Sequence, residues 1–261
     1  MRLQNKVILV TGSTTGIGKA IALRCAKEGA LIVVHGLEED LGKQVISELA
    51  MNKAVLHIED ITIEGAPGRL VDLAIKTFGK LDAIVNNAAM IVSSNIESTD
   101  ERFLRKVIEV NTIAPFALIK AALPYLTPQN GCVLNIGSVN AWSGEPGLLA
   151  YSISKGALMT MTRNLGDTFL RENNVRVNQI NPGWVLTETE IHRKKEQGFR
   201  ADWFKNIPKM FAPAGRLLLP AEIAAAAVYW LSDESGPVSG QVVDLEQYPM
   251  LGRNLPKVPL T

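Results

Sequence analysis

A short apolar run, a glycine-rich turn and a helical pattern follow one another directly at the start of this chain. Residues 6–11 read Lys-Val-Ile-Leu-Val-Thr, and the turn Gly12-Ser-Thr-Thr-Gly16-Ile-Gly18 leads into a helical pattern over residues 20–28. Glycines let the backbone turn sharply and approach a pyrophosphate, while a helix N-terminus offers free N–H groups to an anion. The order Gly-x-x-x-Gly-x-Gly departs from the general Gly-x-Gly-x-x-Gly fingerprint. The chain is therefore expected to begin with a nucleotide-binding strand, turn and helix.

Apolar runs and helical patterns alternate along the rest of the sequence. The expected strands are residues 7–11, 31–35, 54–58, 83–86, 132–136, 176–180 and 241–243. Strands that are apolar throughout are typical of a parallel sheet covered by helices on both faces. The sequence therefore predicts an α/β fold with a single Rossmann-type, doubly wound parallel sheet of about seven strands. At 261 residues, 47% of them hydrophobic, the chain suits one dinucleotide-binding and catalytic domain over residues 1–261.

Tyr151 and Lys155 stand four residues apart, and Ser138 precedes Tyr151 by thirteen positions. On a helix, residues four apart share a face, so the phenol and the ammonium reach the same region of space. A tyrosine pKa near ~10 must fall for the phenol to act as a base near neutrality, and a nearby lysine charge could supply much of the ~4 kcal/mol required. Ser138 would bond the reacting oxygen of a substrate. Taken alone, Tyr-x-x-x-Lys is common and more often describes a surface helix.

Four further motifs accompany these residues in a fixed order. They are Asp60 after the third expected strand, Asn86-Asn87-Ala88 after the fourth, Asn111 in Val-Asn-Thr, and Pro182-Gly183-Trp-Val185-x-Thr187 after the sixth. Together with the glycine turn and the serine, tyrosine and lysine, they resemble the short-chain dehydrogenase/reductase family over roughly residues 6–244.

This resemblance implies a role for each matching residue. Tyr151 would exchange the alcohol proton, Lys155 would lower the Tyr151 pKa and bind the nicotinamide ribose, and Ser138 would orient the substrate oxygen. Asn111 would anchor a water that relays protons past Lys155. Asp60 would bond the adenine amino group, Asn87 and Ala88 would line the adenosine ribose, and Val185 with Thr187 would hold the carboxamide. The expected cofactor residues are Gly12, Ser13, Thr14, Thr15, Gly16, Ile17, Gly18, His35, Gly36, Leu37, Asp60, Ile61, Asn87, Ala88, Ala89, Tyr151, Lys155, Pro182, Gly183, Val185 and Thr187.

The end of the second strand, His35-Gly36-Leu37-Glu38, bears on the choice of cofactor. An acid at position 36 would bind the ribose 2′-hydroxyl of NAD, and an arginine at position 37 would bind the 2′-phosphate of NADP. Neither is present, while Glu38, Glu39 and Asp40 would repel a phosphate if they face it. The alternative is that these acids only favour a helix N-terminus. The residues favour NAD and leave NADP open.

Two other positions depart from the family pattern. Ala89 stands where glycine is more frequent and adds a methyl group beside the cofactor. Asp244-Leu-Glu-Gln-Tyr248 replaces the usual Asp-Gly-Gly, so the C-terminal segment and its oligomer contacts are expected to differ.

Residues 187–213 form the least regular stretch, which the resemblance identifies as a substrate lid. Its basic residues are His192, Arg193, Lys194, Lys195, Arg200, Lys205 and Lys209. Cations on a closing segment recognise an anionic group, and the faces of Trp142 and Trp184 suit a sugar ring. More often, such a run of charged residues is simply the solvent-exposed face of a helix. We expect a polar, sugar-like substrate contacted by Trp142, Trp184 and Arg193.

Three functions follow from these residues. The favoured one is hydride transfer between NAD(P) and a secondary alcohol or ketone, with a sugar, polyol or similar polar metabolite as substrate. A reductase of a carrier-bound 3-oxoacyl group would use the same residues and would need a basic docking patch. A cofactor-binding sensor without turnover is the third, and the intact Ser138, Tyr151 and Lys155 oppose it.

Charge and cysteine content limit the remaining classes. A formal net charge of +1 gives no basic field for nucleic acid. No uninterrupted apolar run of about 18 residues offers a membrane span, and no signal-peptide core follows Met1. Cys25 and Cys132 read as buried small hydrophobes without a metal cluster. We expect a cytoplasmic homotetramer or dimer, paired through the helices that carry Asn111 and Tyr151.

Overall fold

The chain forms one seven-stranded parallel sheet in a computed structural model that describes residues 1–251. The strands are β1 (Val7–Val10), β2 (Leu31–Gly36), β3 (Ala54–Ile58), β4 (Ala83–Asn86), β5 (Cys132–Ile136), β6 (Arg176–Pro182) and β7 (Val242–Leu245). They lie in the order β3-β2-β1-β4-β5-β6-β7, and every neighbouring pair is parallel. The order reverses between β1 and β4, so the loops that leave these strands meet where such folds bind ligands. The predicted fold class is confirmed.

The strand boundaries agree with the prediction except at a few ends. The predicted strands 54–58, 83–86 and 132–136 coincide with β3, β4 and β5. β1 ends one residue early, since the chain turns at Gly12, whose φ is 59°. β6 continues to Pro182 because Asn181 and Pro182 pair with Asp244 and Leu245. The sequence Asn-Pro-Gly is typical of a turn, and the prediction therefore ended this strand too soon.

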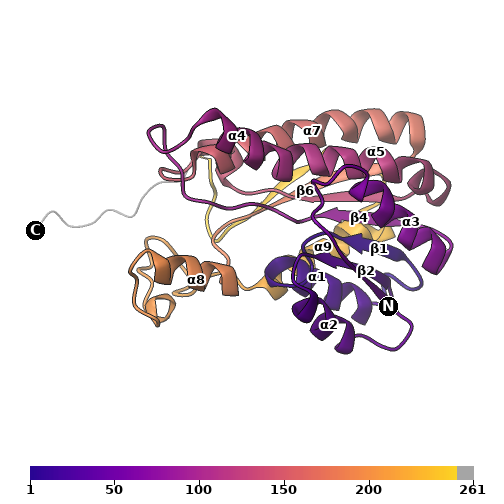
Figure 1. The fold of residues 1–261 in the computed structure, drawn as a ribbon, viewed down its shortest axis with the longest axis horizontal. Helices are drawn as coiled ribbons and strands as arrows, with labels where there is room; N and C mark the ends of the chain where they lie inside the picture. Colours follow the sequence, from indigo (N-terminus) through magenta and orange to yellow (C-terminus); the bar gives the residue numbers. More distant parts are fainter. Residues whose placement is uncertain (252–261) are drawn as a thin grey trace, which may run out of the picture.

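Helices cover both faces of the sheet (Figure 1). One face carries α1 (Gly16–Lys27), α2 (Glu39–Ser47) and α9 (Pro220–Leu231), and the other carries α3 (Ala66–Phe78), α5 (Ala114–Leu126) and α7 (Leu149–Asn173). Alternate residues of β1 serve the two cores, with Ile8 and Val10 in the first and Val7 and Leu9 in the second. This two-sided burial explains why the strands are apolar throughout.

Both cysteines lie in the core completed by α1 and α9, where Cys25 and Cys132 are buried as free thiols. This agrees with their interpretation as small apolar residues. Among residues 1–251, no group of three His, Cys, Asp or Glu side chains is arranged to hold a metal ion.

One helical stretch, Glu101–Gln129, is long and apolar enough to cross a membrane by length and composition alone. It joins α4 (Glu101–Ile108), the π-helical turn η1 (Glu109–Ile113), α5 and the 3-10 turn η2 (Thr127–Gln129). Its residues Leu118, Ile119 and Ala122 are buried in the same core as α3. We therefore interpret the stretch as a core helix of the fold.

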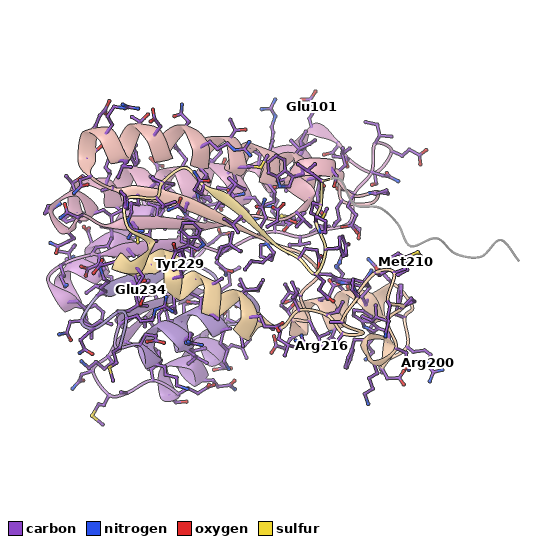
Figure 2. The ribbon with its side chains drawn as sticks, turned by 180° about the vertical axis from the view of Figure 1, so that it is seen from behind. Glu101, Arg200, Met210, Arg216, Tyr229 and Glu234 are labelled. Atoms are coloured by element: carbon purple, nitrogen blue, oxygen red, sulfur yellow. The ribbon has the colours of Figure 1, made fainter. Side chains whose placement is uncertain are left out.

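The 187–213 segment projects from the rest of the fold in Figure 1, and Arg200 and Met210 mark it from the opposite side in Figure 2. It contains α8 (Glu188–Glu196) and the 3-10 turn η3 (Trp203–Lys205). A small core joins four residues of the segment to three that flank it; the four are Trp203, Phe204, Ile207 and Ala212, and the three are Trp184, Leu186 and Leu217. The segment is therefore more ordered than its sequence suggested.

Candidate active site

The glycine turn links β1 to α1 at the reversal point of the sheet. Gly12 and Gly16 have φ values of 59° and 54°, in the region that favours glycine. A Cβ on Gly18 would lie 2.2 Å from the carbonyl oxygen of Gly12, so a larger residue would displace the turn. The first turn of α1 contains no acidic residue. Its N–H groups could therefore hold the pyrophosphate of a dinucleotide.

Asn87 ties the loop after β4 to this glycine turn. Its Nδ2 donates to the carbonyl oxygens of Thr11 and Gly12, each at 2.9 Å. The Thr11 hydroxyl oxygen accepts from the main-chain N–H groups of Asn87 and Ala88, each at 3.0 Å. The family resemblance assigns Asn87 to the adenosine ribose, and the structure shows that its Nδ2 group shapes the turn. Ala89, the next residue but one, is exposed at the same edge.

His35, near the end of β2, supports the glycine turn from within the protein. Its Nδ1 accepts from the Gly12 N–H at 3.3 Å, and its Nε2 donates to the Glu59 carbonyl oxygen at 2.9 Å. The N–H of Ser13 also donates to the His35 carbonyl oxygen at 2.7 Å. Burial lowers the pKa of His35 to about 4, so the imidazole is neutral near pH 7.

The next residues of β2 explain the missing acid at position 36. A Cβ on Gly36 would lie 2.4 Å from the Thr14 methyl group, so no side chain fits there without moving Thr14. The Thr14 hydroxyl donates a hydrogen bond of 2.9 Å to the carboxylate of Glu38. Leu37 is 62% exposed. Glu38 therefore brings an acid to the glycine turn from two residues further along the chain.

The residues after β3 divide between the surface and the core. Asp60 is exposed, and its Oδ1 accepts from the N–H and the hydroxyl of Thr62 at 2.9 and 2.8 Å. Ile61 is buried in the core that α3 completes. The side chain of Ile61 therefore supports the loop, and only its backbone could contact a cofactor.

β5 and α7 bring Ser138, Tyr151 and Lys155 together. Ser138 follows β5 and hydrogen-bonds to the side chain of Tyr151. The Nζ of Lys155 lies 5.7 Å from the centre of the Tyr151 ring and donates to the Ile136 carbonyl oxygen at 2.7 Å. The Asn140 N–H donates to the Ser138 hydroxyl oxygen at 3.1 Å. A serine, a phenol and an ammonium group thus converge at one buried place.

Burial opposes the ionisation of both α7 side chains. Desolvation raises the pKa of Tyr151 to about 12, although the hydrogen bond with Ser138 acts in the opposite direction. Desolvation also lowers the pKa of Lys155 to about 7. The sequence suggested that Lys155 would depress the Tyr151 pKa, whereas the structure gives the larger effect to burial. Tyr151 therefore keeps its proton at neutral pH.

Asn111 is fully buried in η1, between α4 and α5. Its Nδ2 donates to the Met90 carbonyl oxygen at 3.0 Å and to the Ser154 hydroxyl oxygen at 2.9 Å, and its Oδ1 accepts from the Met90 N–H at 2.7 Å. The side chain thus fastens η1 to α7 and to the loop after β4. A π-helical turn interrupts the regular helical hydrogen bonds, and such turns are frequent at functional sites.

The two tryptophans of the predicted substrate site are held by carboxylates. Trp142, on α6 (Asn140–Ser143), donates from Nε1 to Asp244 at 2.9 Å, and the Arg163 guanidinium lies 4.8 Å from its ring centre. Trp184 donates from Nε1 to Glu190 at 2.8 Å and stacks on Trp203 at 5.4 Å between ring centres. The edges of both indoles are therefore fixed.

Arg193 forms an ion pair with Glu190 at 2.7 Å on α8. Its positive charge acts to lower the pKa of Tyr151, while the negative charge of Glu145 acts to raise it. Glu145 accepts from the Asn140 Nδ2 at 2.9 Å. Arg193 and Glu145 are thus both within electrostatic reach of Tyr151, and Glu190 already balances the Arg193 charge.

The chain after β6 connects the candidate catalytic residues with the 187–213 segment. A Cβ on Gly183 would lie 1.9 Å from Glu246, whose carboxylate accepts from the Trp184 N–H at 3.0 Å. Val185, which follows the Pro182–Gly183 turn, is buried and pairs with Leu218. Thr187 caps α8 by accepting from the Glu190 N–H at 3.1 Å.

Thr187 also lies beside the glycine turn, because a Cβ on Gly16 would be 3.5 Å from its methyl group. Sequence reasoning did not assign Glu145, Glu190, Asp244 or Glu246 to the site. Asp244 and Glu246 carried a signal, since they fall where the family pattern is altered. Glu145 and Glu190 look like ordinary surface charges in the sequence.

Comparison with known proteins adds to these observations. Residues 12–246 match the family model described as enoyl-(acyl carrier protein) reductase. The chain is 36% identical to glucose 1-dehydrogenase 2 of Bacillus subtilis, over 91% of this chain and 92% of that protein. It is 32% identical to an uncharacterized oxidoreductase and 30% identical to a 3-oxoacyl-(acyl-carrier-protein) reductase, both of Thermotoga maritima, over 94% of this chain and 98% of each relative. The chain therefore belongs to the short-chain dehydrogenase/reductase family of oxidoreductases.

Proposed function

We propose that this chain is an NAD(P)-dependent enzyme that transfers a hydride between nicotinamide and a secondary alcohol or its ketone. The observation that carries this proposal is the convergence of Ser138, Tyr151 and Lys155, with Ser138 hydrogen-bonded to Tyr151 and Lys155 held by Ile136. Ser138 would orient the substrate oxygen. Tyr151, protonated at neutral pH, would donate its proton to a ketone oxygen and recover it when an alcohol is oxidised. The bound nicotinamide supplies or accepts the hydride.

The remaining site residues serve the cofactor and the proton path in this proposal. The glycine turn would hold the phosphates, Asp60 would bond the adenine, and Val185 and Thr187 would hold the carboxamide. Lys155 would bind the nicotinamide ribose and pass protons to a water on the backbone around Asn111.

NAD is the cofactor that the site favours over NADP. The carboxylate of Glu38 is bound to Thr14 of the glycine turn at 2.9 Å, which places a negative charge next to Gly36. A carboxylate accepts hydrogen bonds from ribose hydroxyls and repels a 2′-phosphate. The proposal for NAD rests on this pair of residues.

A polar, hydroxylated substrate fits the groups around Tyr151. Glu145, which accepts from Asn140, and Arg193, which pairs with Glu190, both act on the pKa of Tyr151. The amide and the guanidinium can donate to substrate hydroxyls, and the carboxylates can accept from them. The indole of Trp184 offers an apolar face. One relative is named a glucose dehydrogenase. We propose a sugar or polyol as the substrate and residues 187–213 as its lid within a single domain.

Reduction of a carrier-bound 3-oxoacyl group is the second candidate, because a relative is named for this reaction. The family model is named for a different reductase of acyl-carrier substrates. A docked acidic carrier would need unbalanced cations near the site. Several lid cations have acidic neighbours instead: Arg193 pairs with Glu190, His192 lies near Glu196, and Arg200 pairs with Asp202. This charge balance supports the small polar substrate.

A substrate panel tests these functions. Sugars, polyols, simple secondary alcohols and 3-oxoacyl thioesters are incubated with NAD(H) or NADP(H), and the nicotinamide absorbance is followed. We expect turnover with a hydroxylated substrate and NAD. Turnover with thioesters alone would establish the second candidate, and tight cofactor binding without any turnover would favour the sensor.

The same proposal includes a cytoplasmic homodimer or homotetramer. Phe116 on α5 and Ile153 on α7 are 48% and 44% exposed, on the helices expected to pair. Burying such side chains against a second copy would stabilise an assembly.

A further inference from the structure

A chain of side-chain hydrogen bonds crosses the sheet from β4 to β7. Its members are Asn86, Asn135, Thr162, Gln179, Asn181 and Asp244, and each donates to the next at 2.7 to 3.0 Å. The first five are buried. Buried amides are costly unless paired, and here each has its partner. This series of hydrogen bonds ends on the carboxylate of Asp244, whereas its other members are amides and a hydroxyl.

Asp244 sets the direction in which the Asn181 amide points. An ionised carboxylate only accepts hydrogen bonds, and Asp244 Oδ1 accepts from Asn181 Nδ2 at 3.0 Å and from Trp142 Nε1 at 2.9 Å. Asn181 must therefore turn its Oδ1 the other way. There it accepts from the Ser138 N–H at 3.1 Å and from the Gln179 Nε2 at 2.7 Å. If the Asn181 amide were reversed, its NH₂ group would face the Ser138 N–H and the Gln179 Nε2, and both contacts would set donor against donor.

The Asn181 amide also packs directly against the backbone before Ser138. A Cβ on Gly137 would lie 2.1 Å from the Asn181 Oδ1, so the position admits only glycine. On the far side of Ser138, the helix α6 is held because Trp142 donates to Asp244. One carboxylate therefore secures the backbone at Ser138 through Asn181 and the following helix through Trp142.

We propose that Asp244, on the last strand, is a positioning residue for Ser138. It acts through Asn181 and holds the Ser138 backbone where its hydroxyl meets Tyr151. This inference rests on the proposed function for its effect on turnover, but the effect on the Ser138 backbone is independent of any substrate. It also gives a physical reason for an aspartate at this position.

The test compares Asp244→Leu with Asp244→Asn. Leucine removes the acceptor for both donors. Asparagine keeps this acceptor, because its Oδ1 can accept from both the Asn181 Nδ2 and the Trp142 Nε1, whereas its NH₂ group can accept from neither. We expect Asp244→Leu to lower kcat at least about tenfold, since small displacements of a reacting group are costly, and to leave the cofactor Kd within about twofold. We expect Asp244→Asn to stay within about threefold of the parent in both quantities.

Amide hydrogen exchange supplies the readout that needs no substrate. Exchange of the peptide that covers residues 137–142 is followed by mass spectrometry in the parent, Asp244→Leu, Asp244→Asn and Trp142→Phe. The Ser138 amide should exchange faster in Asp244→Leu and as in the parent in Asp244→Asn. Trp142→Phe, which removes one donor and keeps the Asn181 bond, should leave the Ser138 amide protected.

The outcomes separate this inference from the proposed function. Unchanged Ser138 exchange in folded Asp244→Leu overturns the inference, and so does equal loss of protection in Asp244→Asn. A parent that turns over no alcohol or ketone overturns the proposed function, while the exchange result still decides whether Asp244 positions Ser138. If Asp244→Leu does not fold, Asp244→Ser takes its place, because its shorter side chain cannot reach both donors.

Discussion

Lys155 is bound to the carbonyl oxygen of Ile136 at 2.7 Å, while its Nζ lies 5.7 Å from the centre of the Tyr151 ring. The four-residue spacing fixes the two side chains on α7. The bond to Ile136 fixes that part of α7 to β5, two residues before Ser138. The three catalytic candidates are therefore held together by one helix, one strand end and one buried ammonium group.

Tyr151→Phe tests the proton donor. It deletes the hydroxyl and keeps the ring, so turnover should fall by about 10² to 10⁴ or more while the cofactor Kd changes little. Steady-state kinetics and cofactor titration measure the two effects. Tyr229→Phe is the matched control, since Tyr229 lies exposed on α9 (Figure 2). Turnover of Tyr151→Phe within a few-fold of the parent would remove Tyr151 from the mechanism.

Glu38→Gln tests the preference for NAD. The variant removes a negative charge and keeps the shape, so NADPH should bind about tenfold tighter relative to NADH than in the parent. Fluorescence titration with both cofactors gives the ratio. Glu39→Gln should leave it unchanged, because Glu39 pairs with Lys43 at 2.8 Å on an exposed part of α2. A parent that binds NADPH more tightly would reverse the preference.

His35 should make the fold sensitive to mild acid. Its pKa is lowered from 6.5 to about 4, so the native state excludes a proton that the unfolded chain accepts. The stabilisation is complete above pH 6.5 and is lost as the pH falls toward 4, by roughly 2 to 3 kcal/mol.

Urea unfolding of the parent and His35→Asn at pH 7 and pH 4.5 measures this effect. Asparagine keeps an acceptor near Gly12 and does not titrate, so its unfolding free energy should fall less between the two values. His192→Asn, on exposed α8, is the control. Parallel losses in the parent and in His35→Asn would contradict the assignment.

Arg193→Ala tests whether the proposed lid recognises an anionic group of the substrate. Because Glu190 balances the Arg193 charge, kcat/KM should fall by about tenfold for matched neutral and acidic sugars alike. Arg200→Ala, at the outer part of the segment in Figure 2, should change neither. A loss confined to the acidic sugar would instead make Arg193 the reader of an anionic group.

Phe116→Glu combined with Ile153→Glu tests the assembly. The parent should sediment as a dimer or tetramer at micromolar concentration, and two charges on the exposed faces of α5 and α7 should shift it toward the monomer. Phe211→Glu, at another exposed aromatic residue, should leave the distribution unchanged. A monomeric parent would refute the assembly.

The sequence predicted the parts of the fold that depend on local pattern. Apolar runs located all seven strands, because both faces of this sheet are buried, and the spacing of Tyr151 and Lys155 placed them on one helix face. It could not predict that Asp244 meets Trp142, 102 positions away, since such pairs arise only when β7 joins the sheet. It also missed the effect of burial on the Tyr151 pKa, which depends on packing by several elements.

The residues just before and shortly after the 187–213 segment are paired with each other. Leu186 donates its N–H to the Leu218 carbonyl oxygen, and Leu218 donates to that of Trp184, at 2.8 and 3.1 Å. The segment also shares a small core with this paired base, in which Trp184, Leu186 and Leu217 contact residues of the segment. In the role of the proposed lid, a segment built in this way would turn as one body about its paired base. Substrate access would then depend on one rotation about this base. The inner surface of the proposed lid would keep the same shape in its open and closed positions.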